Sequence, residues 1–213
     1  MRSGSAAATT AALATAGGAL GFVGLMAVGR LTLDLGWGRS FHQLGPLELP
    51  VAAPRELVYQ QLASPYLGAT PRGMRHRLQV LDRGADLVVA RHVSSVKLLG
   101  RPAYEAATVE SVGFEEPRRI TFRHLRGPVP HAEEEFVLDE TDGATLLTYR
   151  GELGIDFWAL GRLAGTHWVV PEWMDVVEQH LHQVKADVEA RAAHRAARAG
   201  GGVAGNGEQP EPD

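Results

Sequence analysis

The chain has 213 residues, which suits one domain with a single hydrophobic core and short tails. Its 45% hydrophobic and 22% charged residues are typical of a folded protein and not of a disordered chain. A net charge of -4 at pH 7 gives no reason to expect nucleic-acid binding, and the absence of cysteine excludes disulfides, thiolate nucleophiles and cysteine metal sites.

The N-terminal segment is apolar, with no charged residue from Ala6 to Gly29. This length is enough for a helix to cross a bilayer, so we predict that residues 1–30 form an N-terminal apolar helix that anchors the chain in a membrane by a single pass. The sequence leaves the side of the membrane open. Since Ala and Gly dominate the segment, a cleaved secretory signal ending in small residues and a loosely helical leader of a secreted or cytoplasmic protein are the alternatives.

We expect a linker over residues 31–41 and a folded domain over residues 42–195. The domain begins with a strand over residues 42–52, and a helix follows because Pro54 suits the first turn. This helix is predicted to stop near Ser64 and Pro65, before a connection marked by Gly68 and Pro71.

Residues 75–153 contain repeated extended runs, separated by turn residues at intervals too short to hold helices. Parallel crossover connections are therefore excluded, and six strands in an antiparallel meander are predicted. The turns fall at residues 82–84, 100–102, 116–117, 127–130 and 142–143.

The C-terminal part of the domain has apolar residues at helical spacing: Val170, Met174, Val177, Leu181, Val184 and Val188. This stripe predicts a long helix that covers the sheet. Pro171 removes a backbone donor, so the helix is expected to kink there or to begin afresh after Trp168. Residues 196–213 are Gly-rich and then acidic, and we expect a disordered tail. The predicted fold class is α+β, a curved antiparallel sheet of about seven strands around a long C-terminal helix.

Three phrases carry a family resemblance: residues 51–59 at the helix start, residues 116–122 at a turn before a strand, and residues 136–149 across a hairpin. Together with the order of elements, they resemble the SRPBCC superfamily (START/polyketide cyclase-like) over about residues 42–193. The resemblance implies a helix-grip fold with a cavity between sheet and helix. It also implies a hydrophobic small-molecule ligand, lipid or polyketide-like, since relatives include lipid carriers and polyketide cyclases or dehydrases.

His124 and Glu134 are the candidate catalytic residues. Alternation places His124 on the face of Ile120 and Phe122, and places Glu134 on the face of Phe136 in the next strand. Because the turn between these strands is centred near residues 128–129, the two polar side chains should point inward, opposite or nearly opposite each other. Such a pair could move a proton on a bound carbonyl compound. A buried, mutually satisfied pair with a structural role is the alternative.

Several apolar and aromatic residues are candidate ligand contacts on the same inner surface: Phe122, Phe136, Tyr149, Trp168, Trp173 and Val177. The Tyr149 hydroxyl could bond a ligand or belong to an ordinary core tyrosine. The rings of Trp158, Trp168 and Trp173 are expected to pack in the core. Closure of a cavity mouth or contact with a membrane surface are the alternatives.

We expect no metal or cofactor, since the histidines lack metal-ligand spacing and no dinucleotide, P-loop or G-x-S-x-G pattern occurs. The leading function is a membrane-anchored protein that binds a hydrophobic small molecule. The alternatives are a cyclase or dehydrase that uses His124 and Glu134, and a membrane-associated protein-interaction module. Ligand identity and oligomeric state do not follow from the sequence.

Overall fold

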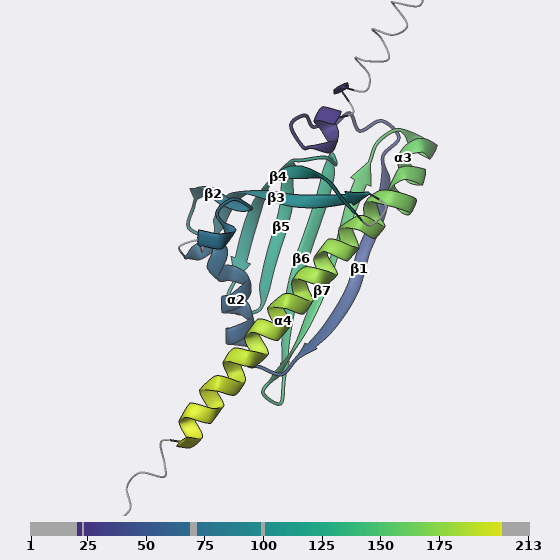
Figure 1. The fold of residues 1–213 in the computed structure, drawn as a ribbon. Coiled ribbons are helices and arrows are strands. Elements are labelled where there is room, and N and C mark those ends of the chain that lie inside the picture. Colours follow the sequence, from purple (N-terminus) through teal and green to yellow (C-terminus); the bar gives the residue numbers. More distant parts are fainter. Residues whose placement is uncertain (1–20, 23, 69–71, 99–100, 202–213) are drawn as a thin grey trace, which may run out of the picture.

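The computed structural model describes residues 21–22, 24–68, 72–98 and 101–201. A seven-stranded sheet wraps around a long C-terminal helix (Figure 1). In chain order the elements are β1 (Ser40–Val51), α2 (Arg55–Leu67), the 3-10 turn η1 (Arg72–Met74), β2 (Leu78–Arg83), β3 (Leu87–Leu98), β4 (Arg101–Glu115), β5 (Arg119–Arg126), β6 (His131–Thr141), β7 (Ala144–Ile155), α3 (Trp158–Ala164), the π-helical turn η2 (Gly165–Val169) and α4 (Val170–Gly201).

The sheet is antiparallel throughout, in the order β1-β7-β6-β5-β4-β3-β2. Strands β2 to β7 form the predicted six-strand meander, and the last strand, β7, pairs with β1 from the start of the domain. The predicted α+β fold, a curved sheet of about seven strands with a long C-terminal helix, is therefore confirmed.

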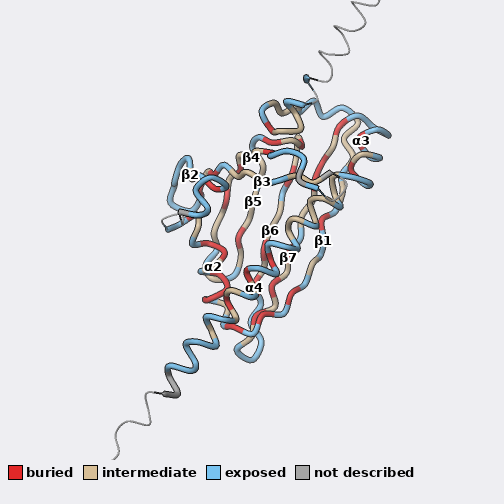
Figure 2. Tube along the Cα trace, viewed as in Figure 1, coloured by how far each residue is buried: buried red, intermediate tan, exposed pale blue. Residues whose placement is uncertain are grey.

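Helix α4 runs diagonally across the concave face of the sheet (Figure 1). Its predicted apolar stripe packs inward, with Leu181 and Val188 fully buried and Val184 nearly so. Burial of three such side chains supplies several kcal/mol of apolar transfer energy, at about 25 cal/mol per Å². Figure 2 shows the consequence, a helix whose far end is exposed and whose middle contains buried positions. α4 continues to Gly201, past the predicted domain end at residue 195.

Helix α2 begins after Pro54 as predicted, but it runs through Pro65 to Leu67. The predicted stop near residues 64–65 is therefore wrong. A proline near the end of a helix removes only one donor, and burial of Tyr66 against the core keeps the last turn in place. The helix thus ends two residues after Pro65, and Tyr66 in this extension belongs to the site described below.

The junction before α4 contains two irregular features. Five residues form the π-helical turn η2, and α4 then begins at Val170 with Pro171 in its first turn. Ala164, Gly165 and Val170 all have right-handed helical φ and ψ, so the helix continues from α3 through η2 into α4, and the predicted fresh start after Trp168 is wrong. The irregularity before Pro171 is the π-helical turn, which changes the backbone hydrogen-bond pattern where proline supplies no donor.

Most of the predicted membrane anchor, residues 1–20 and 23, lies outside the described residues. Within the part of the chain that the structure describes, no helix is both long enough and apolar enough to cross a membrane. The end of the predicted anchor segment and the predicted linker both bond to the fold: the Val28 carbonyl accepts from the Ala107 amide at 3.0 Å, and Thr32 in the linker bonds the Gly127 backbone at 2.8 Å. The last residues of the chain, 202–213, also lie outside the described set.

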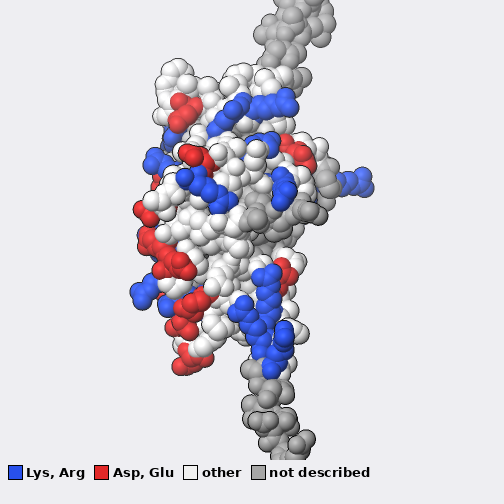
Figure 3. Space-filling model, turned by 90° about the vertical axis from the view of Figure 1, so that its left-hand side faces the viewer, with Lys and Arg blue, Asp and Glu red and all other residues white. Residues whose placement is uncertain are grey.

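The outer surface carries charges of both signs. Figure 3 shows the side of the molecule that carries α2 and β2, where Lys and Arg lie among Asp and Glu. On the convex face of the sheet, Glu135 accepts from Arg119 and from Arg150, and Arg123 lies 3.3 Å from Glu133. Burial is the largest single influence on the pKa of Glu135 and raises it. The hydrogen bonds and charges of Arg150 and Arg119 together outweigh burial, so the pKa of Glu135 is lowered.

Candidate functional site

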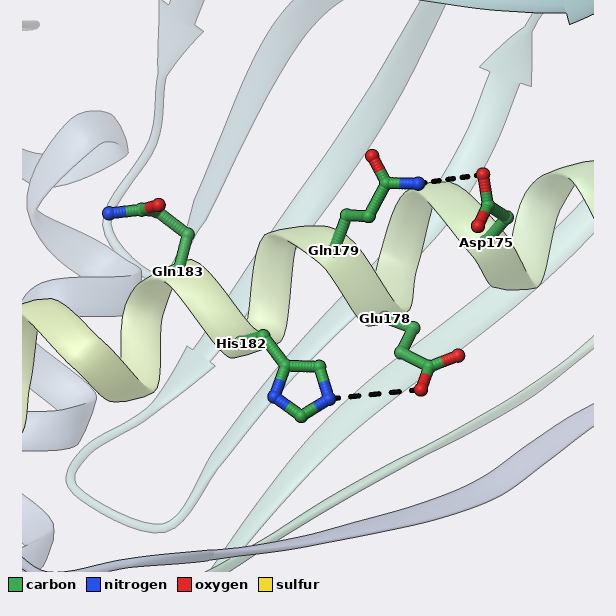
Figure 4. Close-up of a pocket in the computed structure, with 5 residues that line it drawn as sticks. All are labelled: Asp175, Glu178, Gln179, His182 and Gln183. Carbon is green, nitrogen blue, oxygen red and sulfur yellow. Dashed lines mark hydrogen bonds and ion pairs between the residues drawn. The ribbon is translucent and has the colours of Figure 1, made fainter. Parts of the chain in front are cut away.

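Two hollows occur on outer surfaces. One, of about 510 Å³, lies on the solvent side of α4 and is lined by Asp175, Glu178, Gln179, His182 and Gln183 (Figure 4). Gln179 bonds Asp175 and His182 lies at ion-pair distance from Glu178, in each case one helical turn apart, which is ordinary for a solvated helix surface. The other, of about 610 Å³, lies over the charged convex face of the sheet and includes Arg119, Glu135 and Arg150.

The chemically distinctive part of the molecule is its interior, where polar side chains from three neighbouring strands meet. Glu110 on β4 and His124 on β5 are register partners, and their Oε2 and Nε2 atoms lie 3.4 Å apart. Both side chains are only 4% exposed. A buried carboxylate is expensive unless a polar or charged partner stands beside it, so this pair is a specific feature of the core.

Glu134 on β6 lies on the other side of His124, with 3.7 Å between Oε2 and Nε2. Its Oε1 accepts hydrogen bonds from the Tyr149 hydroxyl and, at 2.8 Å, from the Trp173 indole N–H. The structure thus brings the two predicted catalytic residues together. Their strands pair with Phe122 opposite Glu134, so His124 is a diagonal neighbour of the carboxylate. Whether the pair is catalytic stays a prediction.

Backbone geometry makes room for Glu134. Its register partner on β7 is Gly151. A Cβ atom at Gly151 would lie 2.4 Å from the Glu133 carbonyl oxygen and 3.0 Å from Glu134 Cγ. Glycine at this position therefore allows β6 to approach β7 closely and lets the carboxylate lie over the neighbouring strand.

A second histidine extends the network toward α2. His92 on β3 lies with Nδ1 3.4 Å from Glu110 Oε1, and its Nε2 is 3.0 Å from the Tyr66 hydroxyl. The two rings are also stacked, with centroids 5.6 Å apart. The continuous series Tyr66, His92, Glu110, His124 and Glu134 crosses the inner face of the sheet. We call these five residues the interior polar network.

Two buried atoms of this network have no hydrogen-bond partner in the described protein, Glu110 Oε1 and His124 Nδ1. The neighbouring His92 Nδ1 is at ion-pair distance from Glu110 Oε1 but not in hydrogen-bonding geometry. Most buried polar atoms in folded proteins are paired, so unpaired ones at the same place need an explanation.

Burial and nearby carboxylates keep the hydroxyls of both tyrosines of the site, Tyr66 and Tyr149, neutral. Burial, followed by the charges of Glu110 and Glu134, raises the pKa of Tyr66 well above its ordinary value of 10. Burial, and then Glu134, likewise raises the pKa of Tyr149. Each hydroxyl therefore remains a hydrogen-bond donor at neutral pH and is not a phenolate base.

His180 on α4 is an exposed histidine near this region. Burial is the main cause that lowers the pKa of its imidazole, and the charge of His92 is the second. His180 follows Val177 by three residues and precedes Val184 by four, at the edge of the stripe that faces the sheet.

The structure places most of the predicted ligand contacts around the network. The rings of Phe122 and Phe136 meet edge to face at 5.2 Å, and Trp173 packs at 5.2 Å from the His124 ring. Val177 packs against the core. Trp168 differs, since it lies on η2 and is 68% exposed.

The expectation that Trp158 and Trp168 pack in the core is therefore wrong. Trp158 is 64% exposed at the start of α3. The chain turns outward just before this helix, where Phe157 and Trp158 both adopt positive φ. Only Trp173, which lies on the inward stripe of α4, meets the expectation.

Sequence reasoning missed Glu110, His92 and Tyr66. Strand alternation contained a signal for two of them, because Glu110 shares its face with Val112, and His92 shares its face with Val88 and Ala90. Their meeting with His124 depends on a pairing irregularity between Val109 and Glu110, for which the sequence carries no marker.

A curved antiparallel sheet that grips one long helix defines the class of fold: the chain has the helix-grip fold that the sequence resemblance implied. Among solved structures, it is similar to the protein TTHA0849 from Thermus thermophilus, with a TM-score of 0.57 and 18% identity over 71% of this chain and 99% of that one. It is also similar to the di-domain ARO/CYC protein BexL of the BE-7585A biosynthetic pathway, with a TM-score of 0.50 and 14% identity over 73% of this chain and 50% of that one. No protein-family model and no curated protein matches the sequence. At these identities the likeness establishes the fold alone.

Proposed function

We propose that the protein binds an apolar small molecule bearing a hydroxyl or carbonyl group, held between the sheet and α4 with that group on the interior polar network. One observation carries the proposal: Glu110 Oε1 and His124 Nδ1 are buried without a partner at the centre of an otherwise paired network. A ligand hydroxyl can donate to the carboxylate oxygen, and either ligand group can accept from a protonated ring nitrogen.

The energetics favour such a ligand. A buried polar atom left unpaired costs about 1–3 kcal/mol, and a hydrogen bond to a charged group returns about 1.5–3 kcal/mol. The surrounding rings offer apolar contact: Tyr66 lies 6.0 Å from both Phe114 and Phe122, measured between ring centroids. A few convergent polar groups among aromatic side chains are characteristic of small-molecule sites.

The proposal is tested with two probes that differ by one hydroxyl, 1-naphthol and naphthalene, whose binding is measured by equilibrium dialysis. We expect the protein to prefer 1-naphthol by about tenfold, the equivalent of one hydrogen bond to a charged group. Equal affinity for the two probes would contradict the role of the network.

A matched pair of variants locates the binding. Glu110→Leu replaces the buried carboxylate by an apolar side chain of similar size, whereas Glu105→Leu alters an exposed residue of the same strand. We expect Glu110→Leu to abolish the preference for 1-naphthol while naphthalene still binds, and Glu105→Leu to leave both affinities unchanged. A preference that survives Glu110→Leu would place the hydroxyl elsewhere.

Proton transfer at the same site is a second candidate function, favoured by the position of His124 between the carboxylates of Glu110 and Glu134, at 3.4 and 3.7 Å. An imidazole so placed can take a proton from a carbon next to a ligand carbonyl and return it elsewhere, as cyclisation and dehydration require. The ARO/CYC name of the structural neighbour BexL is consistent with this candidate.

Exchange of the α protons of 2-tetralone in D2O, followed by NMR, tests the second candidate without knowledge of the natural substrate. We expect the wild type to accelerate exchange above the buffer rate, and His124→Gln to remove the acceleration while 2-tetralone affinity changes only a few-fold. Equal loss of exchange and affinity in His124→Gln would mean that His124 only holds the ligand.

A further inference from the structure

Large apolar side chains lie exposed at the end of the molecule that carries α3. We call this surface the end patch and define it by Trp37, Phe41, Phe157, Trp158, Leu160, Leu163 and Trp168. Leu160 is 75% exposed, and three of the four tryptophans of the chain belong to the patch. A cluster of this kind on a folded protein indicates a surface that meets something apolar.

Hydrogen bonds tie the segment around Trp37 to the start of α3. The buried Asp156 carboxylate accepts from the backbone amides of Leu35 and Gly36 at 2.9 and 3.0 Å and from the Arg39 guanidinium at 2.7 Å. The segment that contains Trp37 is thereby tied to the end of β7, ahead of α3. The Phe157 amide also donates to the Trp37 carbonyl at 2.8 Å.

The start of α3 is strained in a way that presents its rings outward. Phe157 and Trp158 have φ angles of 80° and 48°, unusual for bulky residues. The Trp158 ring lies against Gly38, where an added Cβ would be 2.3 Å from the indole. Such strain persists only when the surroundings fix it, so the exposed rings are a built feature of the fold.

The chemistry of the patch matches a lipid surface. Tryptophan prefers the boundary between lipid headgroups and acyl chains, where its apolar ring and polar N–H both find partners. Between Asp156 and Glu172 the chain contains Arg162 and His167 but no acidic residue, which suits anionic headgroups. The two flanking carboxylates are engaged within the fold, Asp156 by Arg39 and Glu172 by the Lys97 backbone amide. The acidic residue of the adjoining segment, Asp34, is paired with Arg39.

The charge-free stretch from Ala6 to Gly29 joins the fold at the same end. Gly127, which bonds Thr32, lies in the β5–β6 turn, at the end of the sheet where β7 leads into α3. Figure 1 shows the earliest coloured segment and α3 at one end of the molecule. The apolar N-terminal sequence therefore joins the fold at the end of the molecule that carries the exposed rings of the end patch.

We propose that the end patch docks on the surface of a lipid bilayer that contains anionic headgroups, with Trp158, Leu160 and Trp168 inserted at the headgroup boundary. Docking of this kind is peripheral and requires no membrane-spanning helix. It is independent of the ligand-binding proposal, because the patch and the interior polar network share no residue.

The absence of cysteine allows a direct test on the full chain. Leu160→Cys and, as the matched control, Leu81→Cys on β2 each introduce one exposed thiol for an environment-sensitive nitrobenzoxadiazole label. Vesicles of phosphatidylcholine with a minority of phosphatidylglycerol are then added. We expect emission at position 160 to rise several-fold, shift to the blue and be quenched by lipids with nitroxide-labelled acyl chains, while position 81 does not respond.

Two results would overturn the proposal. If the protein floats with vesicles but position 160 does not respond, another part of the chain makes the contact. If the label at position 160 is already shielded before lipid is added, the chain itself or a second copy covers the patch. As a second measurement, Leu160→Gln with Leu163→Gln should weaken vesicle binding about tenfold, whereas Leu81→Gln with Leu87→Gln should not.

Discussion

The buried carboxylate of Asp156 gives the sharpest stability prediction. It is 1% exposed, accepts two backbone amides and the Arg39 guanidinium, and so fixes the N-terminal segment to the end of the sheet. Replacing it by alanine leaves the Arg39 Nε–H and two backbone amides without their acceptor. Removal of one partner from a buried ion pair costs about 3–5 kcal/mol. Arg39 keeps its bond to the exposed Asp34, so we expect the lower end, about 3 kcal/mol of unfolding free energy.

The assay is urea unfolding of Asp156→Ala and of Asp34→Asn, which removes the other partner of the same arginine. Asp34 is 60% exposed, so its variant should cost at most about 1 kcal/mol. A loss below about 1 kcal/mol in Asp156→Ala as well would refute the anchoring role, since that is the range of a surface pair.

The same carboxyl predicts a pH dependence. The hydrogen bond from Arg39 is the main cause that lowers the pKa of Asp156 from its ordinary value of 3.8. Its contribution to stability is therefore fully present above the unfolded-state pKa and is lost as the pH falls through the lower folded-state pKa. The stability difference between the wild type and Asp156→Asn should be constant above about pH 5 and shrink below about pH 4. A constant difference down to about pH 2 would contradict this.

Three further predictions follow from packing and ionisation. Leu181→Ala, at the fully buried centre of α4, should cost about 2–5 kcal/mol in chemical unfolding, against less than about 0.5 kcal/mol for exposed Leu125→Ala; equal costs would contradict the predicted burial. Gly151→Ala should cost about 1–3 kcal/mol, because the new Cβ meets the Glu133 carbonyl, and an unchanged midpoint would mean that the strands can separate freely. Burial raises the pKa of Tyr149, so the contribution of this hydroxyl to stability is present below about pH 10 and is lost above it. Between about pH 10 and 11.5, stability should therefore fall less in Tyr149→Phe than in the wild type. Equal falls would contradict the raised pKa.

Much of the fold follows from local sequence signals. Closely spaced turn residues between extended runs excluded parallel crossovers, and the stripe from Val170 to Val188 predicted the covering helix and its inward face. The end of α2 did not follow, because the burial of Tyr66 outweighs the effect of Pro65, and burial is a tertiary property.

Part of the candidate site could be predicted from the sequence. Alternation and one turn brought His124 near Glu134, since a short hairpin sets its own register. Glu110 and His92 come from strands farther along the sheet, where a pairing irregularity shifts the register, so their meeting with His124 is fixed only by the assembled sheet. The exposure of Trp158 and Trp168 could not be predicted, because the backbone adopts positive φ at Phe157 and Trp158 and no local residue pattern indicates this turn.

The measurement that tests the central claim most directly is native mass spectrometry of the full chain purified gently from cells, with extraction of any bound compound. We predict a stoichiometric apolar molecule bearing a hydroxyl or carbonyl group, retained by Glu105→Leu and lost or diminished in Glu110→Leu. An empty wild-type protein that also binds neither 1-naphthol nor naphthalene would contradict the claim.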